Sequence, residues 1–99
     1  MKAKIDRKIN LDKAAEIMKA LGHPIRIQMV ELISQKGKFC VSDIYKTLKM
    51  EQSTASHHLG ILRKGGVLKT ERKGKQIYYL LNGDNYYRLL DCIQACSCK

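Results

Sequence analysis

Hydrophobic residues recur at helical spacing over the first third of the chain. Between Leu11 and Leu21 they stand mostly three or four positions apart, and Gly22 interrupts the pattern. The next segment opens with Pro24, which helices accept in their first turn, and it is hydrophobic on more than one side. This segment is therefore expected to be the central helix of the core, with Asn10 and His23 as the N-caps of the two helices.

The stretch from Val41 to Leu62 predicts two short helices joined by a tight turn. Ser42 is the expected N-cap of the first helix, over 43–48. Because Glu51 caps less well, Ser53 is the expected N-cap of the second. The second helix carries a stripe of small and aliphatic residues that should pack inward, namely Ala55, Leu59 and Leu62.

The other side of this second helix is rich in hydrogen-bonding groups. Its candidate DNA contacts are Gln52, Ser53, Thr54, Ser56, His57 and His58. Such a side suits the major groove of DNA, where it can bind base edges and phosphates. Adjacent residues on a helix point about 100° apart. For His57 and His58 we therefore expect DNA contact by one and packing by the other, in preference to metal binding. An ordinary amphipathic surface helix explains this stretch equally well when it is taken alone.

A basic hairpin is predicted directly after this helix. Gly65 and Gly66 end the helix, residues 73–75 form the hairpin tip, and the alternation of Ile77, Tyr79 and Leu81 is typical of a strand. Residues 63–75 hold six Lys or Arg and one acid, a net charge of +5. The residues expected to contact phosphates or the minor groove are Arg72, Lys73 and Lys75. The order α-α-α-α-β-β-α that results is a mainly helical, winged helix-turn-helix fold.

Four runs of the chain carry a family resemblance. They are KALGHPIRIQMVELI, FCVSDI, QSTASHHLGILRKGGVL and KGKQIYYLL, in this order, within residues 14–81. Together they resemble the ArsR/SmtB family of bacterial and archaeal repressors. The resemblance implies a homodimer, paired through its terminal helices, that binds a palindromic operator in double-stranded DNA and is released by an inducer.

Two metal sites of that family are incomplete in this chain. Members that bind thiophilic metals carry a Cys-Val-Cys-Asp pattern, of which Cys40 and Asp43 are kept while Ser42 replaces the second cysteine. Serine is a poorer ligand for soft metals than a thiolate. The family's zinc site on the terminal helix uses Asp and His. Asp84 is present there, but no histidine follows His58, so that site is expected to be absent.

The C-terminal segment offers a different set of sulfur ligands. Cys92, Cys96 and Cys98 lie within seven residues, and Cys40 is an optional partner. Three thiolates suit arsenite or antimonite, and a fourth donor would make a zinc or cadmium site. The alternative is a redox or reactive-sulfur sensor that forms a disulfide or a polysulfide bridge. Coincidence is the third possibility.

Length and charge agree with a single regulatory domain. The chain has 99 residues and a net charge of +10, which favours a polyanionic partner. We expect one domain over 1–99, with a basic arm at 1–9 and a dimerisation helix with a Cys-rich tail at 82–99. The arm is interpreted as a solvated tail in preference to a DNA-binding one.

The remaining sequence features bear on location and on activity. No apolar run approaches the ~18 residues of a membrane-spanning helix, and no signal-peptide pattern opens the chain. We therefore expect a cytoplasmic protein with no membrane partner. No catalytic arrangement of side chains is evident, so an enzyme is not expected. A sequence-independent DNA binder and a protein-interaction module without DNA stay as alternatives to a repressor.

Overall fold

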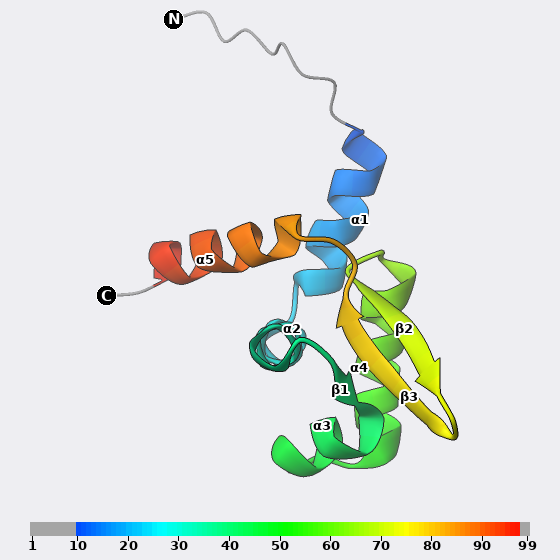
Figure 1. The fold of residues 1–99 in the computed structure, drawn as a ribbon. Helices are drawn as coiled ribbons and strands as arrows, with labels where there is room; N and C mark the ends of the chain where they lie inside the picture. Colours follow the sequence, from blue (N-terminus) through cyan, green and yellow to red (C-terminus); the bar gives the residue numbers. More distant parts are fainter. Residues whose placement is uncertain (1–9, 98–99) are drawn as a thin grey trace, which may run out of the picture.

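The computed structural model describes residues 10–97 and has the predicted mainly helical architecture (Figure 1). The elements are α1 (Leu11–Leu21), α2 (Pro24–Lys36), β1 (Phe39–Cys40), α3 (Val41–Thr47), α4 (Gln52–Lys64), β2 (Leu68–Lys73), β3 (Gln76–Leu81) and α5 (Asn85–Ser97). The predicted helix-turn-helix is α3 and α4, and the predicted wing is the hairpin of β2 and β3. The basic arm at 1–9 and Cys98 lie outside the described residues.

Both N-caps predicted for the first two helices are confirmed. The side chain of Asn10 accepts a hydrogen bond from the backbone N–H of Lys13 at 3.0 Å. The Nδ1 atom of His23 accepts one from the backbone N–H of Ile25 at 3.2 Å. Each bond satisfies a backbone donor that a helix leaves unpaired in its first turn. The sharp connection between α1 and α2 is held by the His23 bond and by the backbone N–H of Gly22, which donates to the carbonyl of Lys19 at 3.1 Å.

The hydrophobic core lies between α2, α3, α4 and the hairpin. The predicted stripe of α4 is buried, and α2 supplies three buried side chains as expected of a central helix. The largest side chains without solvent contact are Met29, Ile33, Ile44, Leu59, Leu62 and Leu68. Burying each of them stabilises the fold by roughly 1.5–3 kcal/mol relative to leaving it exposed. Because α4 contributes to this core along its length, its position is fixed and its polar side faces outward.

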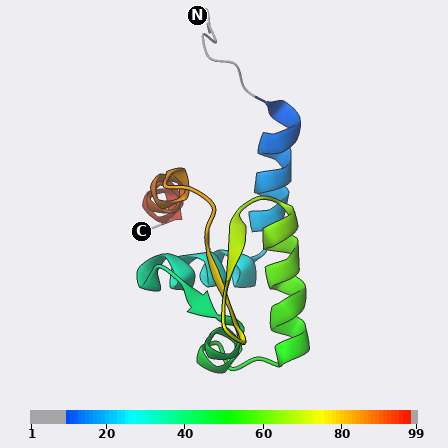
Figure 2. The ribbon, with the colours of Figure 1, turned by 45° about the vertical axis from the view of Figure 1, so that its right-hand side comes forward.

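Strand β3 is the centre of a small antiparallel sheet with the order β1-β3-β2. Arg72 pairs with Ile77 and Lys73 with Gln76 at the end of the hairpin, and Gly74 has the positive φ of 62° that the turn requires. The two-residue strand β1, in which Cys40 pairs with Tyr78, was not predicted. A strand this short shows no alternation in sequence and forms only because β3 is beside it. Figure 2 shows the hairpin alongside α4.

The predicted N-caps of α3 and α4 are wrong. Helix α3 begins at Val41, with Cys40 at the N-cap, so that Ser42 lies inside the helix and its Oγ lies 3.3 Å from the Cys40 Sγ. Helix α4 begins at Gln52 and has Glu51 at the N-cap, so that Ser53 is also inside the helix. Neither N-cap residue makes a side-chain capping hydrogen bond. Ile44 and Ala55 are fully buried and hold both helices in the core without local caps.

The terminal helices keep apolar side chains uncovered within one protomer. Of the helical pattern in α1, Leu11 is 73% exposed and Met18 is 67% exposed. Helix α5 runs out from the body of the domain (Figure 1) and has no fully buried residue. At its start the hydroxyl of Tyr86 donates to the backbone carbonyl of Gly66 at 3.0 Å. The two helices thus present hydrophobic surface to solvent, and the Tyr86–Gly66 hydrogen bond attaches the start of α5 to the domain.

Candidate nucleic-acid interface

Helix α4 presents a polar side to solvent. Of the candidate contacts, Gln52, Ser53, Thr54, Ser56 and His57 are all exposed. The opposite side of the helix is held in the core by Ala55, Leu59 and Leu62, each without solvent exposure. Side chains on this outer face supply hydrogen-bond donors and acceptors with little bulk. A helix of this kind, anchored from behind, can enter a major groove and approach base edges.

His58 differs from the other candidate contacts in its position. It is half-buried, its Nδ1 lies 3.4 Å from Nη1 of Arg26, and its ring centroid lies 5.0 Å from that of His23. Burial is the largest of the causes that lower the pKa of His58. The positive charges that His23, Arg26 and His57 can carry lower this pKa further. His58 therefore faces α2, whereas His57 is exposed, and DNA contact by either stays a prediction.

The hairpin carries exposed positive charge. Arg72, Lys73 and Lys75 are all exposed at or near its tip. The acid of this basic run, Glu71, forms an ion pair with Lys38 across 3.4 Å. The same Lys38 ammonium lies 5.4 Å from the ring centroid of Tyr78. Although an exposed pair of this type contributes only about 0–1 kcal/mol to stability, it offsets the negative charge on the wing.

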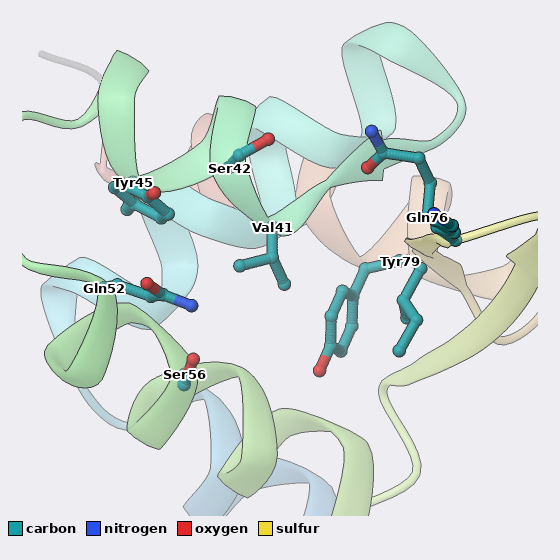
Figure 3. A pocket seen from close by; sticks show the side chains of 9 residues that line it. Val41, Ser42, Tyr45, Gln52, Ser56, Gln76 and Tyr79 are labelled. Carbon is teal, nitrogen blue, oxygen red and sulfur yellow. The ribbon is translucent and has the colours of Figure 1, made fainter.

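A hollow of about 420 Å³ lies between the helix-turn-helix and the hairpin (Figure 3). It is lined by Val41, Ser42, Tyr45, Gln52, Ser56, Lys75, Gln76, Ile77 and Tyr79. Three predicted contacts, Gln52, Ser56 and Lys75, are thus brought together, while the other predicted contacts do not line it. Sequence reasoning missed Tyr45, Gln76 and Tyr79 as members of this surface. The alternation in this segment identified Tyr79 only as a strand residue, and nothing in the sequence indicated a role for Tyr45.

The cysteines fall into two separate environments. Cys92 and Cys96 are exposed on α5, four residues apart and therefore on one face of the helix. Cys40 is buried, and its thiol donates to Oδ2 of Asp43 at 3.2 Å. Within residues 10–97, no group of three or more His, Cys, Asp or Glu side chains is arranged to hold a metal ion. Cys40 therefore does not form a common site with Cys92 and Cys96 in one protomer.

Comparison with known proteins identifies the family. The family model described as "Bacterial regulatory protein, arsR family" matches residues 23–70. An uncharacterized HTH-type transcriptional regulator of Methanocaldococcus jannaschii is 38% identical over 82 residues, which cover 83% of this chain and 92% of that protein. This chain belongs to the ArsR family. The resemblance noted over residues 14–81 is thereby confirmed.

Other relatives of this ArsR-family chain include a regulator named for cadmium resistance and a solved DNA-binding domain. A cadmium resistance transcriptional regulatory protein CadC homolog of Staphylococcus aureus is 33% identical over 77 residues, covering 78% of this chain and 64% of that protein. The solution structure of a homodimeric winged helix-turn-helix DNA-binding domain of Mycobacterium bovis has a TM-score of 0.83 and 34% identity, covering 98% of this chain and 90% of that one.

Membership of the ArsR family decides the broad class of activity. The chain is a transcriptional regulator with a winged helix-turn-helix fold and is not an enzyme, as predicted. Among the residues that the structure describes, none of the helices has the length and hydrophobicity needed to span a bilayer.

Proposed function

We propose that this ArsR-family protein is a homodimeric repressor that binds a palindromic operator and leaves it when a thiophilic metal or metalloid binds Cys92, Cys96 and Cys98. The observation that carries the DNA-binding part is the pairing of two surfaces. The exposed polar side of α4 lies beside a hairpin whose Arg72, Lys73 and Lys75 are exposed. Helix α4 would enter the major groove while the hairpin binds phosphates or the minor groove.

Exposed apolar surface on the terminal helices supports the dimer. Leu11 and Met18 on α1 and Tyr87 on α5 are large hydrophobic side chains that one protomer leaves exposed. A second copy related by a two-fold axis would cover them. The Mycobacterium bovis domain with this fold is itself homodimeric. Such a dimer would present two copies of α4 about 34–36 Å apart, one turn of DNA, which is the reason to expect a palindromic operator.

The arrangement of the tail cysteines supports the choice of inducer. Cys92 and Cys96 are exposed and lie one helical turn apart on α5, so that two sulfurs can reach one ion. Cys98 lies outside the described residues and would supply the third. Three thiolates suit arsenite or antimonite, and a fourth donor would complete a cadmium or zinc site. The Staphylococcus aureus relative is named for cadmium resistance.

Placement of the cysteines on α5 gives the inducer a route to the DNA. The proposed dimer contact and the sulfur ligands share this helix. Binding there would rotate one protomer against the other and move the two α4 helices away from their spacing on the operator. A coupling free energy of ~1–3 kcal/mol, typical of allosteric proteins, would lower operator affinity by about 5–150-fold.

A redox or reactive-sulfur sensor is the second candidate. It rests on the same two exposed thiols, because a disulfide or polysulfide bridge needs only two sulfurs. It makes no use of Cys98, whereas the metal site uses all three tail sulfurs. For that reason the metal or metalloid is preferred.

Operator release distinguishes the two candidates. An operator is first selected from random DNA with the reduced protein, and its binding is followed by fluorescence anisotropy in excess random competitor. Arsenite, antimonite, cadmium and zinc are titrated in one set, and a polysulfide and peroxide in a second. Release by metals alone supports the proposal. Release by the oxidants, reversed by dithiothreitol, supports the redox sensor instead.

The same binding assay tests the alternatives to a repressor. Equal affinity for operator and random DNA would indicate a sequence-independent DNA binder. The absence of any DNA binding would indicate a protein-interaction module.

A further inference from the structure

The hollow between the helix-turn-helix and the hairpin lies where a DNA strand would have to pass. One wall comes from α3 and the first turns of α4, and the other from the end of the hairpin. Its lining includes Ser56 from the exposed side of α4 and Lys75 from the hairpin tip. A strand that leaves the groove occupied by α4 and reaches the hairpin would therefore cross this hollow.

The chemistry of the lining suits an anion. All the polar side chains in it can donate a hydrogen bond, one of them is a lysine, and none is a carboxylate. The side chains of Tyr45, Gln52, Ser56, Gln76 and Tyr79 have no hydrogen-bond partner within residues 10–97. A phosphodiester oxygen is an acceptor that such a set of donors would bind.

Two tyrosines give this hollow fixed donors. The rings of Tyr45 and Tyr79 are half-buried and pack against the hydrophobic core. Figure 3 shows the hydroxyl of Tyr79 pointing toward α4, and the ring of Tyr45 beside the amide of Gln52. Since packing holds the rings, their hydroxyls are positioned before a ligand arrives, and less conformational entropy is lost on binding than with lysine.

We propose that this hollow binds the sugar-phosphate backbone of the operator, with the hydroxyls of Tyr45 and Tyr79 donating hydrogen bonds to phosphate oxygens. The inference rests on the proposed DNA-binding function and adds two contact residues to it. The hollow fixes the position of the strand, so that α4 and the hairpin reach their grooves in register. The two tyrosines carry no sequence information of their own.

The test asks whether each tyrosine hydroxyl acts at one particular phosphate of the operator. Each phosphate of the selected operator is replaced in turn by a neutral methylphosphonate, and the affinities of the wild type, Tyr45→Phe and Tyr79→Phe are measured. Phenylalanine keeps the ring packing and removes only the hydroxyl, and thermal unfolding checks that each variant is folded. Tyr78→Phe is the matched control, because Tyr78 is next to Tyr79 on β3 but is not among the residues that line the hollow.

We expect each hollow variant to bind the unmodified operator about tenfold more weakly, the usual effect of losing one hydrogen bond to a charged group. At the phosphate that its hydroxyl contacts, neutralisation should cost the variant less affinity than it costs the wild type. Tyr78→Phe should match the wild type at every phosphate. The proposal would be overturned if neutralising each phosphate cost both variants as much affinity as it costs the wild type. It would also be overturned if Tyr45→Phe and Tyr79→Phe both bound the unmodified operator with wild-type affinity.

A free anion is the rival occupant, and a separate titration identifies it. Inorganic phosphate is added to the DNA-free protein, and binding is followed through the amide signals of Tyr45 and Ser56 by NMR. Saturable phosphate binding without any coupling to operator phosphates would overturn the backbone proposal in favour of a small-anion site. Failure of the wild type to bind any operator would instead count against the proposed function itself, and the two failures are thereby distinguished.

Discussion

Nη1 of Arg26 lies 3.4 Å from Nδ1 of His58, and this contact joins the start of α2 to the inner side of α4. A guanidinium has only donors, so Nδ1 of His58 can accept from it only when the imidazole is neutral and carries its proton on Nε2. The same arginine donates from Nε to the backbone carbonyl of Ala20 at 2.7 Å. One side chain thus links the end of α1 to the helix that is proposed to enter DNA.

This arrangement predicts an acid-sensitive fold. Because the pKa of His58 is lowered in the folded protein, the unfolded chain binds more protons once the pH falls below about 6.5. The contribution of His58 to the free energy of unfolding is therefore complete above that pH and is lost as the pH falls through the folded-state pKa. Urea unfolding at pH 7.5 and about 5.5 should show a smaller pH dependence in His58→Gln than in the wild type. His57→Gln is the control and should keep most of that dependence, whereas an unchanged dependence in His58→Gln would contradict the prediction.

Gly60, inside α4, and Gly65, at its C-cap, should respond in opposite directions to substitution by alanine. At Gly65 an added Cβ would lie 2.6 Å from Cβ of Ala20, so that α1 must move away from α4. Gly65→Ala is expected to lower the free energy of unfolding by about 1–3 kcal/mol, as overpacking usually does. A Cβ added at Gly60 would have no heavy atom within 4 Å. Gly60→Ala should therefore raise the free energy of unfolding by roughly 0.5–1 kcal/mol. Urea denaturation of both variants measures this, and a loss of stability in both would refute the contrast.

These glycines also show what sequence patterns could predict. The pair Gly65-Gly66 indicated correctly where α4 ends, but the two residues have different roles. Gly66 has the positive φ of 83°, while Gly65 is in the right-handed helical region and is small because Ala20 lies against it. Local conformation can be inferred from residue type. A contact between segments 45 residues apart cannot be.

The same division applies to the candidate site. Spacing predicted the stripe that anchors α4 and hence which residues face outward, since a helical period depends only on the local sequence. It did not predict β1, which forms by pairing with β3, nor Tyr45 and Tyr79 as neighbours across a hollow. It also gave Ser42 a capping role that Cys40 occupies. Each of these features depends on tertiary packing.

The hairpin and α4 should affect DNA binding in different ways. Lys73 and Lys75 are expected to contact phosphates, so Lys73→Ala and Lys75→Ala should weaken binding to operator and random DNA by the same factor. Each should also reduce the slope of log affinity against log salt by about 1. Gln52→Ala should instead narrow the gap between operator and random DNA, by about 1–3 kcal/mol if it reads a base. Salt titrations with both DNAs measure these effects. A loss confined to the operator in the lysine variants would mean that the two roles are reversed.

Charge placed on α1 should separate the protomers. Met18 is 67% exposed in one protomer, so Met18→Lys is expected to leave the monomer folded. In the proposed dimer that side chain would be covered, and the loss of its burial in both protomers should weaken the dimer by at least about tenfold. Sedimentation equilibrium measures this. Gln35→Lys adds the same charge at an exposed position on α2 and serves as the control. A dimer unaffected by Met18→Lys would exclude this side of α1 from the interface.

The last prediction concerns the tail cysteines as the sensing group. Cys92 and Cys96 share one face of α5, so removal of either sulfur should leave too few ligands to hold the metal or metalloid. Cys92→Ser and Cys96→Ser are therefore expected to bind operator with wild-type affinity and to resist release by arsenite or cadmium. Both positions are exposed, so neither substitution should disturb the fold. Operator release is followed by anisotropy, and metal stoichiometry is measured on the DNA-free dimer.

The variant Cys40→Ser tests whether the buried thiol is an additional metal ligand beside the tail cysteines. The Cys40 thiol donates to Asp43, a bond that a serine hydroxyl can also make, so the variant is expected to fold and to be released by metal like the wild type. Loss of release in this variant would add Cys40 to the ligand set, and because Cys40 does not group with the α5 cysteines within one protomer, the site would then bridge two protomers. Release of the Cys92 and Cys96 variants by the same metals would remove the tail from sensing altogether, and the proposed inducer site would have to be abandoned.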